Sequence, residues 1–350
     1  MIKSFFGFTF ENLETFLIKN NLNKNNAISL FNFFFKNYNF IDEINHIENV
    51  SKKTIEIINK KLKFVLLKII KKSTDNNGKT IKFLLELFDK ECIETVLMKF
   101  DYGYSICVST QVGCNMGCKF CASGLIKKIR NLTTEEIVLQ IITIQQEFLK
   151  DEKIKNVVFM GIGEPFDNYK NVVNAIKIIT NHFGLGIAER KITVSTSGIV
   201  PKIIKFAKEQ PKISLAISLH ASTDKIRNKI MPINYLWNIK KLFNAIKKYL
   251  KIATNKRITI EYLLLKNIND SINDAIMLAK LVKNMHCIVD LILYNKVEEH
   301  TFERSNNAHL FAETLIKNNV NVVTRIEYGK KISAACGQLR CKRILNKKIN

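Results

Sequence analysis

Residues 156–219 read NVVFMGIGEPFDNYKNVVNAIKIITNHFGLGIAERKITVSTSGIVPKIIKFAKEQPKISLAISL and alternate short apolar runs with longer amphipathic ones. Short runs rich in Val and Ile are typical of strands buried on both faces of a sheet, and apolar residues at helical spacing predict helices. Strands joined by helices of this length form parallel βαβ units. We expect strands at Asn156–Met160, Lys191–Thr196 and Ile213–Leu219, and helices at Tyr169–His182 and Val200–Glu209.

The alternation extends to both sides of this stretch. Thr133 and Glu136 form a capping box that predicts a helix reaching to Leu149. Strand and helix alternate about six times in all, which predicts an α/β fold with a parallel sheet, either open or closed into a barrel. Further strands are expected at Arg257–Leu265, Ile288–Tyr294 and Asn321–Ile326, and further helices at Ile239–Leu250, Ser271–Lys283 and Asn307–Lys317.

The first ninety residues have a different pattern. Two strand-like runs, Phe64–Lys72 and Thr80–Leu87, flank an Asn-Gly dipeptide that suits a tight hairpin turn. We therefore divide the chain into a helical accessory domain with a hairpin, residues 1–90, and an α/β core, residues 91–350. Helices of the accessory domain, rich in Phe and Lys, are expected at Glu11–Asn20, Asn26–Phe35 and Ser51–Lys63.

The charge is strongly unbalanced. Lys and Arg number 55 against 31 Asp and Glu, so the formal net charge is +24. This excess points to a polyanionic partner, nucleic acid first and an anionic membrane surface second, although a coding bias toward Lys and Asn would also raise it. The sequence has no membrane-spanning segment and no secretion signal. With eight Cys, it predicts a cytoplasmic protein whose thiols bind metal or do chemistry.

Three of the Cys stand close together in GCNMGCKFCASG, residues 113–124. Cys114, Cys118 and Cys121 converge only if the chain loops around one centre, and the glycines among them permit such a loop. Thiolates select zinc or an iron–sulfur cluster. Structural zinc usually has four ligands, often as two C-x-x-C pairs, and no second pair is present. Three thiolates fit a four-iron cluster with one iron left open; the alternative is a zinc knuckle completed by a distant Cys or His.

The motif CNMGCKFC resembles the cluster motif of radical S-adenosylmethionine (SAM) enzymes. More narrowly, the chain from Ile93 to Leu339 resembles the RlmN/Cfr family of RNA adenine methyltransferases, and most closely its adenine-C2 branch, RlmN. The motifs that carry this resemblance are, in order, SICVSTQVGCNMGCKFCASG (105–124), RNLTTEEI (130–137), FMGIGEP (159–165), ITVSTSGIVP (192–201), ISLHAS (217–222), IMPIN (230–234) and AACGQL (334–339).

The resemblance implies a fold and a cofactor site. The fold is a partial (β/α)6 radical SAM barrel with the helical accessory domain and the hairpin added at its amino-terminal side. Cys114, Cys118 and Cys121 are implied to hold one 4Fe–4S cluster, whose open iron binds SAM. Taken singly, Ser195 has an alternative reading as a helix cap and His220 as a satisfied polar residue in a loop. The residues implied to bind SAM follow predicted strands, where α/β folds place their sites: Gly163, Glu164, Ser195, Ser218, Leu219, His220 and Asn295.

The family's chemistry needs two thiols outside the cluster. One SAM methylates a Cys, and a second SAM supplies the radical that activates the S-methyl group, so two SAM are used per turnover. The resemblance assigns the methyl-carrying role to Cys336 and the resolving role, through a disulfide with Cys336, to Cys107. It assigns Glu94 as a proton acceptor. The alternatives are an inert buried thiol at Cys107 and a metal ligand at Cys336.

The remaining thiols have no assigned role. Cys92 and Cys287 lie in apolar runs and are expected in the core. Cys341 either competes for a disulfide or is exposed.

The implied substrates are an adenosine in the peptidyl transferase region of 23S rRNA and one in the anticodon arm of tRNA. The alternative is methylation of C8, the reaction of Cfr-type resistance enzymes, because both ring carbons belong to one base. A zinc-stabilised RNA-binding protein without catalysis is a third hypothesis. We also expect an electron donor such as flavodoxin or ferredoxin, a monomer, and no membrane contact. Basic residues expected to contact RNA are Lys127, Lys128, Arg130, Arg190, Lys191 and Arg340.

Overall fold

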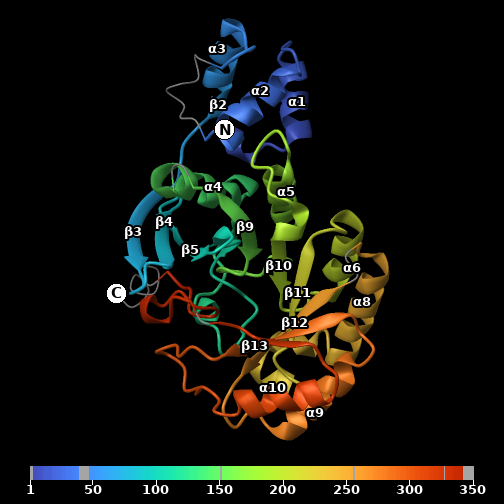
Figure 1. The fold of residues 1–350 in the computed structure, drawn as a ribbon. Helices are drawn as coiled ribbons and strands as arrows, with labels where there is room; N and C mark the ends of the chain where they lie inside the picture. The colour runs from blue at the N-terminus through green and yellow to red at the C-terminus, as the bar shows by residue number, and fades with distance from the viewer. Residues whose placement is uncertain (1–2, 39–46, 150–151, 255–256, 327, 342–350) are drawn as a thin grey trace.

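One large sheet organises the part of the chain that the computed structural model describes, residues 3–38, 47–149, 152–254, 257–326 and 328–341 (Figure 1). From edge to edge its strands are β14 (Val322–Thr324), β13 (Cys287–Leu293), β12 (Ile258–Leu264), β11 (Ser214–Ser218), β10 (Ile192–Thr196), β9 (Ile154–Phe159), β6 (Gly103–Cys107), β5 (Cys92–Phe100), β4 (Thr80–Glu86) and β3 (Lys68–Thr74). Strands β6 and β9 to β14 are parallel, whereas β3 to β6 form an antiparallel meander.

Helices connect the successive parallel strands and cover the outside of the sheet (Figure 1). This alternation confirms the prediction of a partial (β/α)6 barrel. Each helix buries an apolar stripe; α5, for example, buries Val172, Ile176 and Ile179. The connecting helices are α4 (Thr134–Ile144), α5 (Tyr169–Thr180), α6 (Val200–Glu209), α8 (Ile239–Ile252), α9 (Ile272–Val282) and α10 (Ala308–Lys317). Within the described ranges, we find no helix long and apolar enough to cross a membrane.

The boundaries differ from expectation mainly at helix ends and in short elements. The capping box of Thr133 and Glu136 is present, but the last predicted turn, Gln145–Leu149, is π-helical. Short elements carry too few residues for a periodic pattern and were not predicted. These are β1 (Lys3–Ser4) with β2 (Leu62–Lys63), β7 (Gln111–Val112) with β8 (Arg130–Asn131), α7 (Asp224–Ile230), and the short helical turns η1 (Phe5–Gly7), η4 (Ala122–Leu125), η6 (Glu189–Lys191), η7 (Pro232–Tyr235) and η8 (Lys330–Ile332).

Phenylalanine side chains hold the amino-terminal helices together. The ring centroids of Phe5 and Phe34 are 4.8 Å apart, and those of Phe34 and Phe64 are 4.7 Å apart. Phe10 stacks at 5.2 Å on Phe183, in the loop after α5, so these helices pack on the barrel. The three predicted helices are confirmed as α1 (Phe10–Lys19), α2 (Asn26–Phe31) with a π-helical continuation η2 (Asn32–Lys36), and α3 (Lys52–Lys61).

The predicted hairpin is confirmed as β3 and β4, with Gly78 at a φ of 70° in the turn. A φ of this sign costs a side chain-bearing residue steric energy that Gly avoids. Strand β4 also pairs with β5 along its whole length, so the hairpin joins the sheet of the barrel. The apolar core is continuous from the amino-terminal helices into the barrel. The division of the chain at residue 90 stays a prediction.

A carboxyl-terminal segment, residues 333–341, lies against both β5 and the Cys-rich loop. Backbone carbonyls of Gly337 and Leu339 accept hydrogen bonds from Ala122 N–H at 2.7 Å and from Ser123 Oγ at 2.8 Å. Cys341 is buried and forms a disulfide with Cys92, and the two Cα atoms are 6.1 Å apart. Cys92 is therefore in the core as predicted, but bonded. Of the two alternatives for Cys341, the structure shows a disulfide, and exposure is wrong.

Candidate active site

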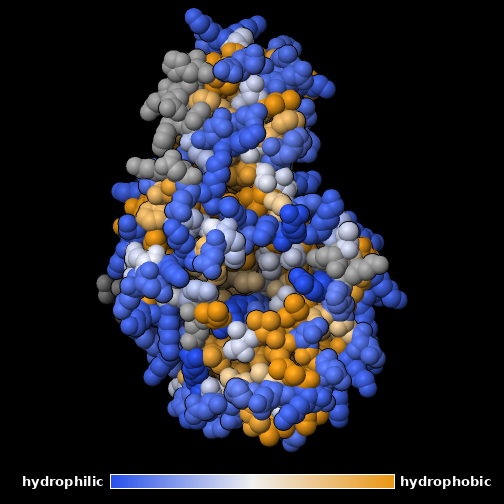
Figure 2. All heavy atoms as spheres, in the orientation of Figure 1, coloured by the Kyte–Doolittle hydropathy of each residue, from blue (hydrophilic) through white to orange (hydrophobic). Residues whose placement is uncertain are grey.

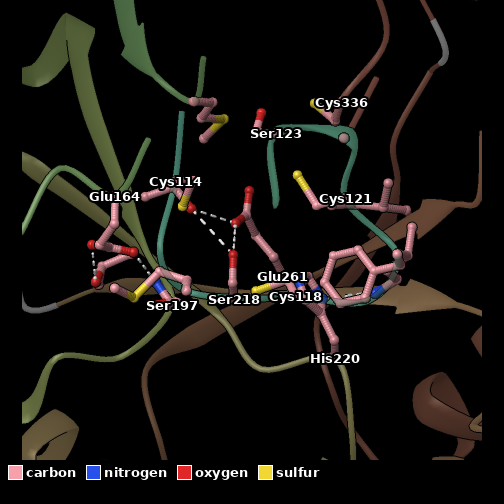
Figure 3. Close-up of a pocket in the computed structure, with 18 of the residues that line it drawn as sticks. Cys114, Cys118, Cys121, Ser123, Glu164, Ser197, Ser218, His220, Glu261 and Cys336 are labelled. Atoms are coloured by element: carbon pink, nitrogen blue, oxygen red, sulfur yellow. Dashed lines mark hydrogen bonds between the residues drawn. The ribbon is translucent and has the colours of Figure 1, made fainter. Parts of the chain in front are cut away.

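Two cavities meet inside the barrel. The carboxyl-end cavity, of about 150 Å³, is lined by the Cys-rich loop and by residues at or just past the carboxyl ends of the strands (Figure 3). The second cavity, of about 730 Å³, is lined by residues along the length of β5, β6, β9 and β13 and by segments before β10 and after β14. We call it the amino-end cavity because its lining extends to the amino ends of β10 and β12, at Arg190, Lys191 and Thr259. Met160, Ile292, Arg325 and Cys336 line both cavities. The space-filling view also shows the face of Figure 1 hollowed near its centre (Figure 2).

Glu164 is held rigidly in the wall of the carboxyl-end cavity. Its Oε1 accepts hydrogen bonds from Thr196 Oγ1 at 2.7 Å and from Phe166 N–H at 3.0 Å. Its Oε2 accepts from Ser197 N–H at 2.8 Å (Figure 3). Burial raises the pKa of Glu164, and these hydrogen bonds oppose the shift. The carboxylate is therefore fixed in one orientation before any ligand arrives.

The loop before Glu164 depends on a close approach to Gln111. Gly163 has a φ of 104°, and a Cβ there would lie 2.6 Å from Gln111 Cβ. Gln111 Oε1 in turn accepts from the Glu164 N–H at 2.9 Å. Any side chain at residue 163 would push the loop away from this partner, so only Gly fits. Gln111 was not among the predicted site residues, and only its position in the motif before the Cys loop pointed to it.

Ser195 and Ser218 share one carboxylate. Both hydroxyls donate to Glu261 Oε2, at 2.6 Å and 2.9 Å. Burial alone would raise the pKa of Glu261, but the charge of Arg325 and the hydrogen bonds hold it below its usual range. Glu261 is thus ionised and orients both hydroxyls. Sequence reasoning missed it, although a Glu inside the apolar run of β12 is a signal for a buried, paired charge.

Arg325 links this carboxylate to Cys336. Its Nη1 donates to Cys336 Sγ at 3.1 Å, its Nη2 to Glu261 Oε1 at 2.7 Å, and its Nε to Asp290 Oδ2 at 2.9 Å. The guanidinium group therefore joins the Cys of the carboxyl-terminal segment to the serines of the barrel. Arg325 directly follows β14, and its charge after an apolar run was the available signal.

His220 and Leu219 form the wall after β11. His220 Nδ1 accepts the Leu263 N–H at 3.0 Å, and burial lowers the pKa of His220 to about 4, so the ring is neutral near pH 7. Leu219 does not line the cavity; its carbonyl accepts from Nε of the fully buried Arg227 at 3.0 Å. Arg227 Nη2 also donates to the carbonyls of Ser197 and Ser218, at 2.7 Å and 3.1 Å, so it braces the loops that line the cavity.

The three thiols of the Cys-rich loop line the carboxyl-end cavity together, as predicted (Figure 3). Gly113 permits the loop: its φ is 76°, and a Cβ would lie 2.5 Å from the Lys127 carbonyl oxygen. Burial raises the pKa of Cys114 to about 12 and that of Cys118 well above its usual range, and neighbouring thiolates add to both shifts. Among the described residues, no three His, Cys, Asp or Glu side chains are placed to hold a single metal ion.

Besides Leu219, three predicted site residues lie outside the carboxyl-end cavity. Cys107 is buried and lines the amino-end cavity with Cys336. Glu94 lines neither cavity: it pairs with Lys82 at 2.9 Å and accepts the Arg340 N–H at 2.8 Å. Asn295 is 5% exposed and lines the amino-end cavity, so the structure does not bring it together with Gly163 and Glu164.

Half of the basic residues expected to contact RNA are engaged with carboxylates. Arg130 forms a two-pronged ion pair with Glu136 at 2.7 Å and 2.8 Å and a further bond to Asp89. Lys128 pairs with Asp167 at 2.6 Å, and Arg340, itself 5% exposed, pairs with Glu298 and Glu299. The exposed candidates are Lys127, Arg190 and Lys191.

Relatives of known family match nearly the whole chain. A probable dual-specificity RNA methyltransferase RlmN from Malacoplasma penetrans is 45% identical over 348 residues, covering 99% of this chain and 98% of that protein. The chain belongs to the RlmN family. The RlmN of Listeria monocytogenes, also described as probable, is 45% identical over 352 residues, covering 97% of this chain and 94% of its own length. The crystal structure of a radical SAM methyltransferase from Sphaerobacter thermophilus, at 33% identity, has a TM-score of 0.90 and covers 97% of this chain and 99% of that one.

The radical SAM superfamily model matches residues 108–279, which include the Cys-rich loop and most of the barrel. Membership of the RlmN family within this superfamily implies a 4Fe–4S cluster and SAM as cofactors. The residues fit both. Three thiols that line one cavity are the kind of ligand that holds an iron–sulfur cluster. A fixed carboxylate and two oriented hydroxyls suit a zwitterionic cofactor.

Proposed function

We propose that this chain methylates C2 of an adenosine in the peptidyl transferase region of 23S rRNA and of an adenosine in the anticodon arm of tRNA. The observation that carries the proposal is the placement of two free thiols outside the Cys-rich loop, Cys107 and Cys336, on the wall of one cavity. The relatives described as dual-specificity RNA methyltransferases support two kinds of RNA substrate. The net charge of +24 supports a polyanionic one.

In this proposal each chain holds one 4Fe–4S cluster and uses two SAM per turnover. Cys114, Cys118 and Cys121 would hold the cluster. Bound together, the two cofactors supply one-electron chemistry able to remove hydrogen from a methyl group. Residues proposed to bind SAM are Gly163, Glu164, Ser195, Ser218 and His220, with Leu219 acting through its carbonyl bond to Arg227. The geometry lends no support to Asn295 in this role, which stays a prediction.

Cys336 would carry the methyl group on its sulfur, where Arg325 Nη1 holds it at the junction of the two cavities. After the methyl carbon is joined to adenine, Cys107 would attack the Cys336 sulfur. The S–S bond forms as the sulfur–carbon bond breaks, and the electron pair of the broken bond leaves with the carbon, which takes up a proton to become the methyl group of the released RNA. Burial raises the pKa of Cys107, and the nearby charge of Arg325 opposes this shift, so Arg325 favours the attacking thiolate.

Glu94 is proposed as the proton acceptor, and its contacts support a second role. Its bond to the Arg340 N–H and its ion pair with Lys82 tie β5 to the segment that carries Cys336. Burial raises the pKa of Glu94, although Lys82 opposes the shift. A carboxyl group with a raised pKa takes up a proton more readily than an exposed one.

We further propose a one-electron donor protein such as flavodoxin or ferredoxin as the reductant, and a monomeric enzyme. The accessory domain, residues 1–90, would contribute to RNA binding through its exposed Lys residues.

The test is mass spectrometry of nucleosides from 23S rRNA and tRNA treated with anaerobically prepared enzyme, SAM and a reductant. We expect 2-methyladenosine; 8-methyladenosine would assign the C8 reaction, and a colourless protein that modifies no adenosine would assign the zinc alternative. Cys107→Ala should accumulate a covalent protein–RNA adduct, seen as a slow band on a denaturing gel, whereas Cys336→Ala should form none. Normal turnover by either variant contradicts the mechanism.

A further inference from the structure

The amino-end cavity is the largest feature that the cofactors leave unused. The cluster thiols, Glu164 and both serines lie in the carboxyl-end cavity, and the two cavities meet at Cys336. A substrate that must reach Cys336 without displacing SAM therefore has the amino-end cavity as its route. Its volume of about 730 Å³ is in the range of sites that enclose a nucleotide-sized ligand.

Aromatic rings form the mouth of this cavity. Phe100 ends β5, Tyr102 lies in the turn before β6, and Tyr328 follows β14. The rings of Phe100 and Tyr102 are stacked, with centroids 4.9 Å apart and an interplanar angle of 7°. Tyr328 meets Phe100 edge to face at 5.1 Å. Tyr102 is 47% exposed, so a flat ring backed by a second ring is presented to solvent. We call these three residues the aromatic mouth.

Positive charge stands beside the aromatic mouth. Lys191 Nζ lies over the Tyr102 ring, 5.4 Å from its centroid, so this flexible side chain has to turn aside when a base stacks on the ring. The neighbouring Arg190 is also exposed. Both residues line the cavity. These are the two candidates among the predicted RNA contacts that lie at this mouth, since Lys128, Arg130 and Arg340 are paired with carboxylates. An exposed ring next to cations is the arrangement that binds single-stranded nucleic acid, with the base stacked and its phosphate neutralised.

Three lining residues of the cavity keep an acceptor oxygen that no described residue satisfies. These are Asn156, Asn295, which is 5% exposed, and Asp290, whose other oxygen is bonded to Arg325. Buried acceptors are normally paired, so the lining favours a ligand that carries N–H donors. The amino group of adenine is such a donor, and Asn is a common partner for it.

We propose that the aromatic mouth stacks the nucleotide next to the target adenosine, and that Arg190 and Lys191 contact its phosphate. This rests on the proposed function, because it takes the amino-end cavity as the place where the extruded base meets Cys336. Stacking on Tyr102 accepts any base, so one mouth serves two RNAs of different sequence.

The test measures binding of a short RNA hairpin with an unpaired adenosine in its loop, by fluorescence anisotropy. Tyr102→Ala should weaken binding roughly five- to a hundredfold, whereas Tyr102→Phe, which keeps the ring, should bind as the wild type does. A matched control is Phe88→Ala, which removes an aromatic ring that is 49% exposed and lies outside both cavities. Lys191→Ala should lower the slope of log affinity against log salt by about one.

Abasic RNA identifies the stacked nucleotide. Removing the base on one side of the target adenosine should weaken wild-type binding by the same factor as Tyr102→Ala, and the two changes together should cost no more than either alone. The proposal is overturned if Tyr102→Ala binds RNA as well as the wild type does. It is also overturned if the affinity losses caused by Tyr102→Ala and by the abasic site multiply, whichever neighbour of the target adenosine lacks its base. Methylation of Cys336 by SAM without RNA, followed by intact mass, should be unchanged in Tyr102→Ala. If the wild type binds RNA through Tyr102 but makes no methyladenosine, the proposed function is contradicted, whereas the proposed role of the aromatic mouth is supported.

Discussion

The two cavities that meet at Cys336 are built in different ways. The carboxyl-end cavity takes its polar groups from the carboxyl ends of strands and the loops that follow them, and Glu164, Ser195 and Ser218 are each fixed by hydrogen bonds. The amino-end cavity is wider, is lined largely by apolar and aromatic side chains, and has an exposed ring at its mouth. A rigid polar site suits a cofactor of constant shape, whereas an open aromatic one suits a polymer that arrives in several sequences.

The largest expected effect is a loss of RNA methylation without a loss of RNA affinity, which distinguishes the roles of the two cavities. Cys118→Ala removes one thiol of the carboxyl-end cavity, so RNA methylation should fall at least roughly a thousandfold because the thiols of that cavity work as a unit. RNA affinity should change less than about twofold, since the amino-end cavity keeps all its lining. Nucleoside mass spectrometry and anisotropy measure the two quantities. Cys287→Ala, which removes a buried free thiol on β13, is the control and should stay active.

The second effect concerns Arg325, which belongs to both cavities. Arg325→Gln leaves Glu261 and Asp290 facing each other without a counter-charge, so the free energy of unfolding should fall by about 3 kcal/mol. Cys336 also loses its hydrogen-bond donor, so its methylation by SAM should slow about tenfold. Intact mass follows methylation and denaturant titration follows stability.

Arg325→Lys separates the charge of this residue from its geometry. Lys retains the positive charge but not the planar fork, so stability should recover more than the methylation rate does. Wild-type methylation rates in both Arg325 variants would show that Arg325 does not position Cys336.

The smallest expected effect is a pH dependence of the free energy of unfolding, which tests the burial of His220 in the wall of the carboxyl-end cavity. Burial lowers the pKa of His220 to about 4, below its unfolded value of about 6.5, so the unfolded chain binds a proton first as the pH falls. This residue therefore lowers the stability of the wild type by about 1.4 kcal/mol per pH unit between these two values. His220→Asn, which tolerates the left-handed backbone there, lacks this effect.

Denaturant titrations at pH 7 and pH 5 measure this difference. The stability gap between the wild type and His220→Asn should shift by about 2 kcal/mol in favour of the variant at pH 5. An unchanged gap for His220→Asn would mean that the ring is protonated in the folded protein.

The carboxyl-end cavity was largely predictable, because its residues are local to motifs. Strand periodicity located the ends of β9, β10 and β11, and the thiol spacing located the loop that faces them. Residues that act through distant partners could not be predicted. Gln111 and Arg325 contribute through bonds to Glu164 and Glu261, each more than fifty residues away in the chain, and nothing local in the sequence encodes those partners.

The amino-end cavity was predictable only in part: Cys107, Cys336 and Lys191 were named in the sequence analysis, but not the fact that they share a cavity with Tyr102 and Tyr328. Tyr102, Lys191 and Tyr328 are isolated residues in three separate segments, and only the closure of the barrel brings them together. The disulfide of Cys92 and Cys341 has the same origin, since its partners are 249 residues apart. For Asn295 and Glu94, a motif gave the residue, but the geometry places both away from the carboxyl-end cavity.

Segment 333–341 imposes an order of assembly on the enzyme. It is held by contacts that reach back to Glu94 on β5, to Ala122 and Ser123 in the Cys-rich loop, and to Cys92 through the disulfide. Every strand of the sheet precedes it in the chain. Because the ribosome synthesises the chain from its amino terminus, the barrel can fold before Cys336 has been synthesised. The reactive thiol of Cys336 is therefore added to the protein after the whole sheet that surrounds it.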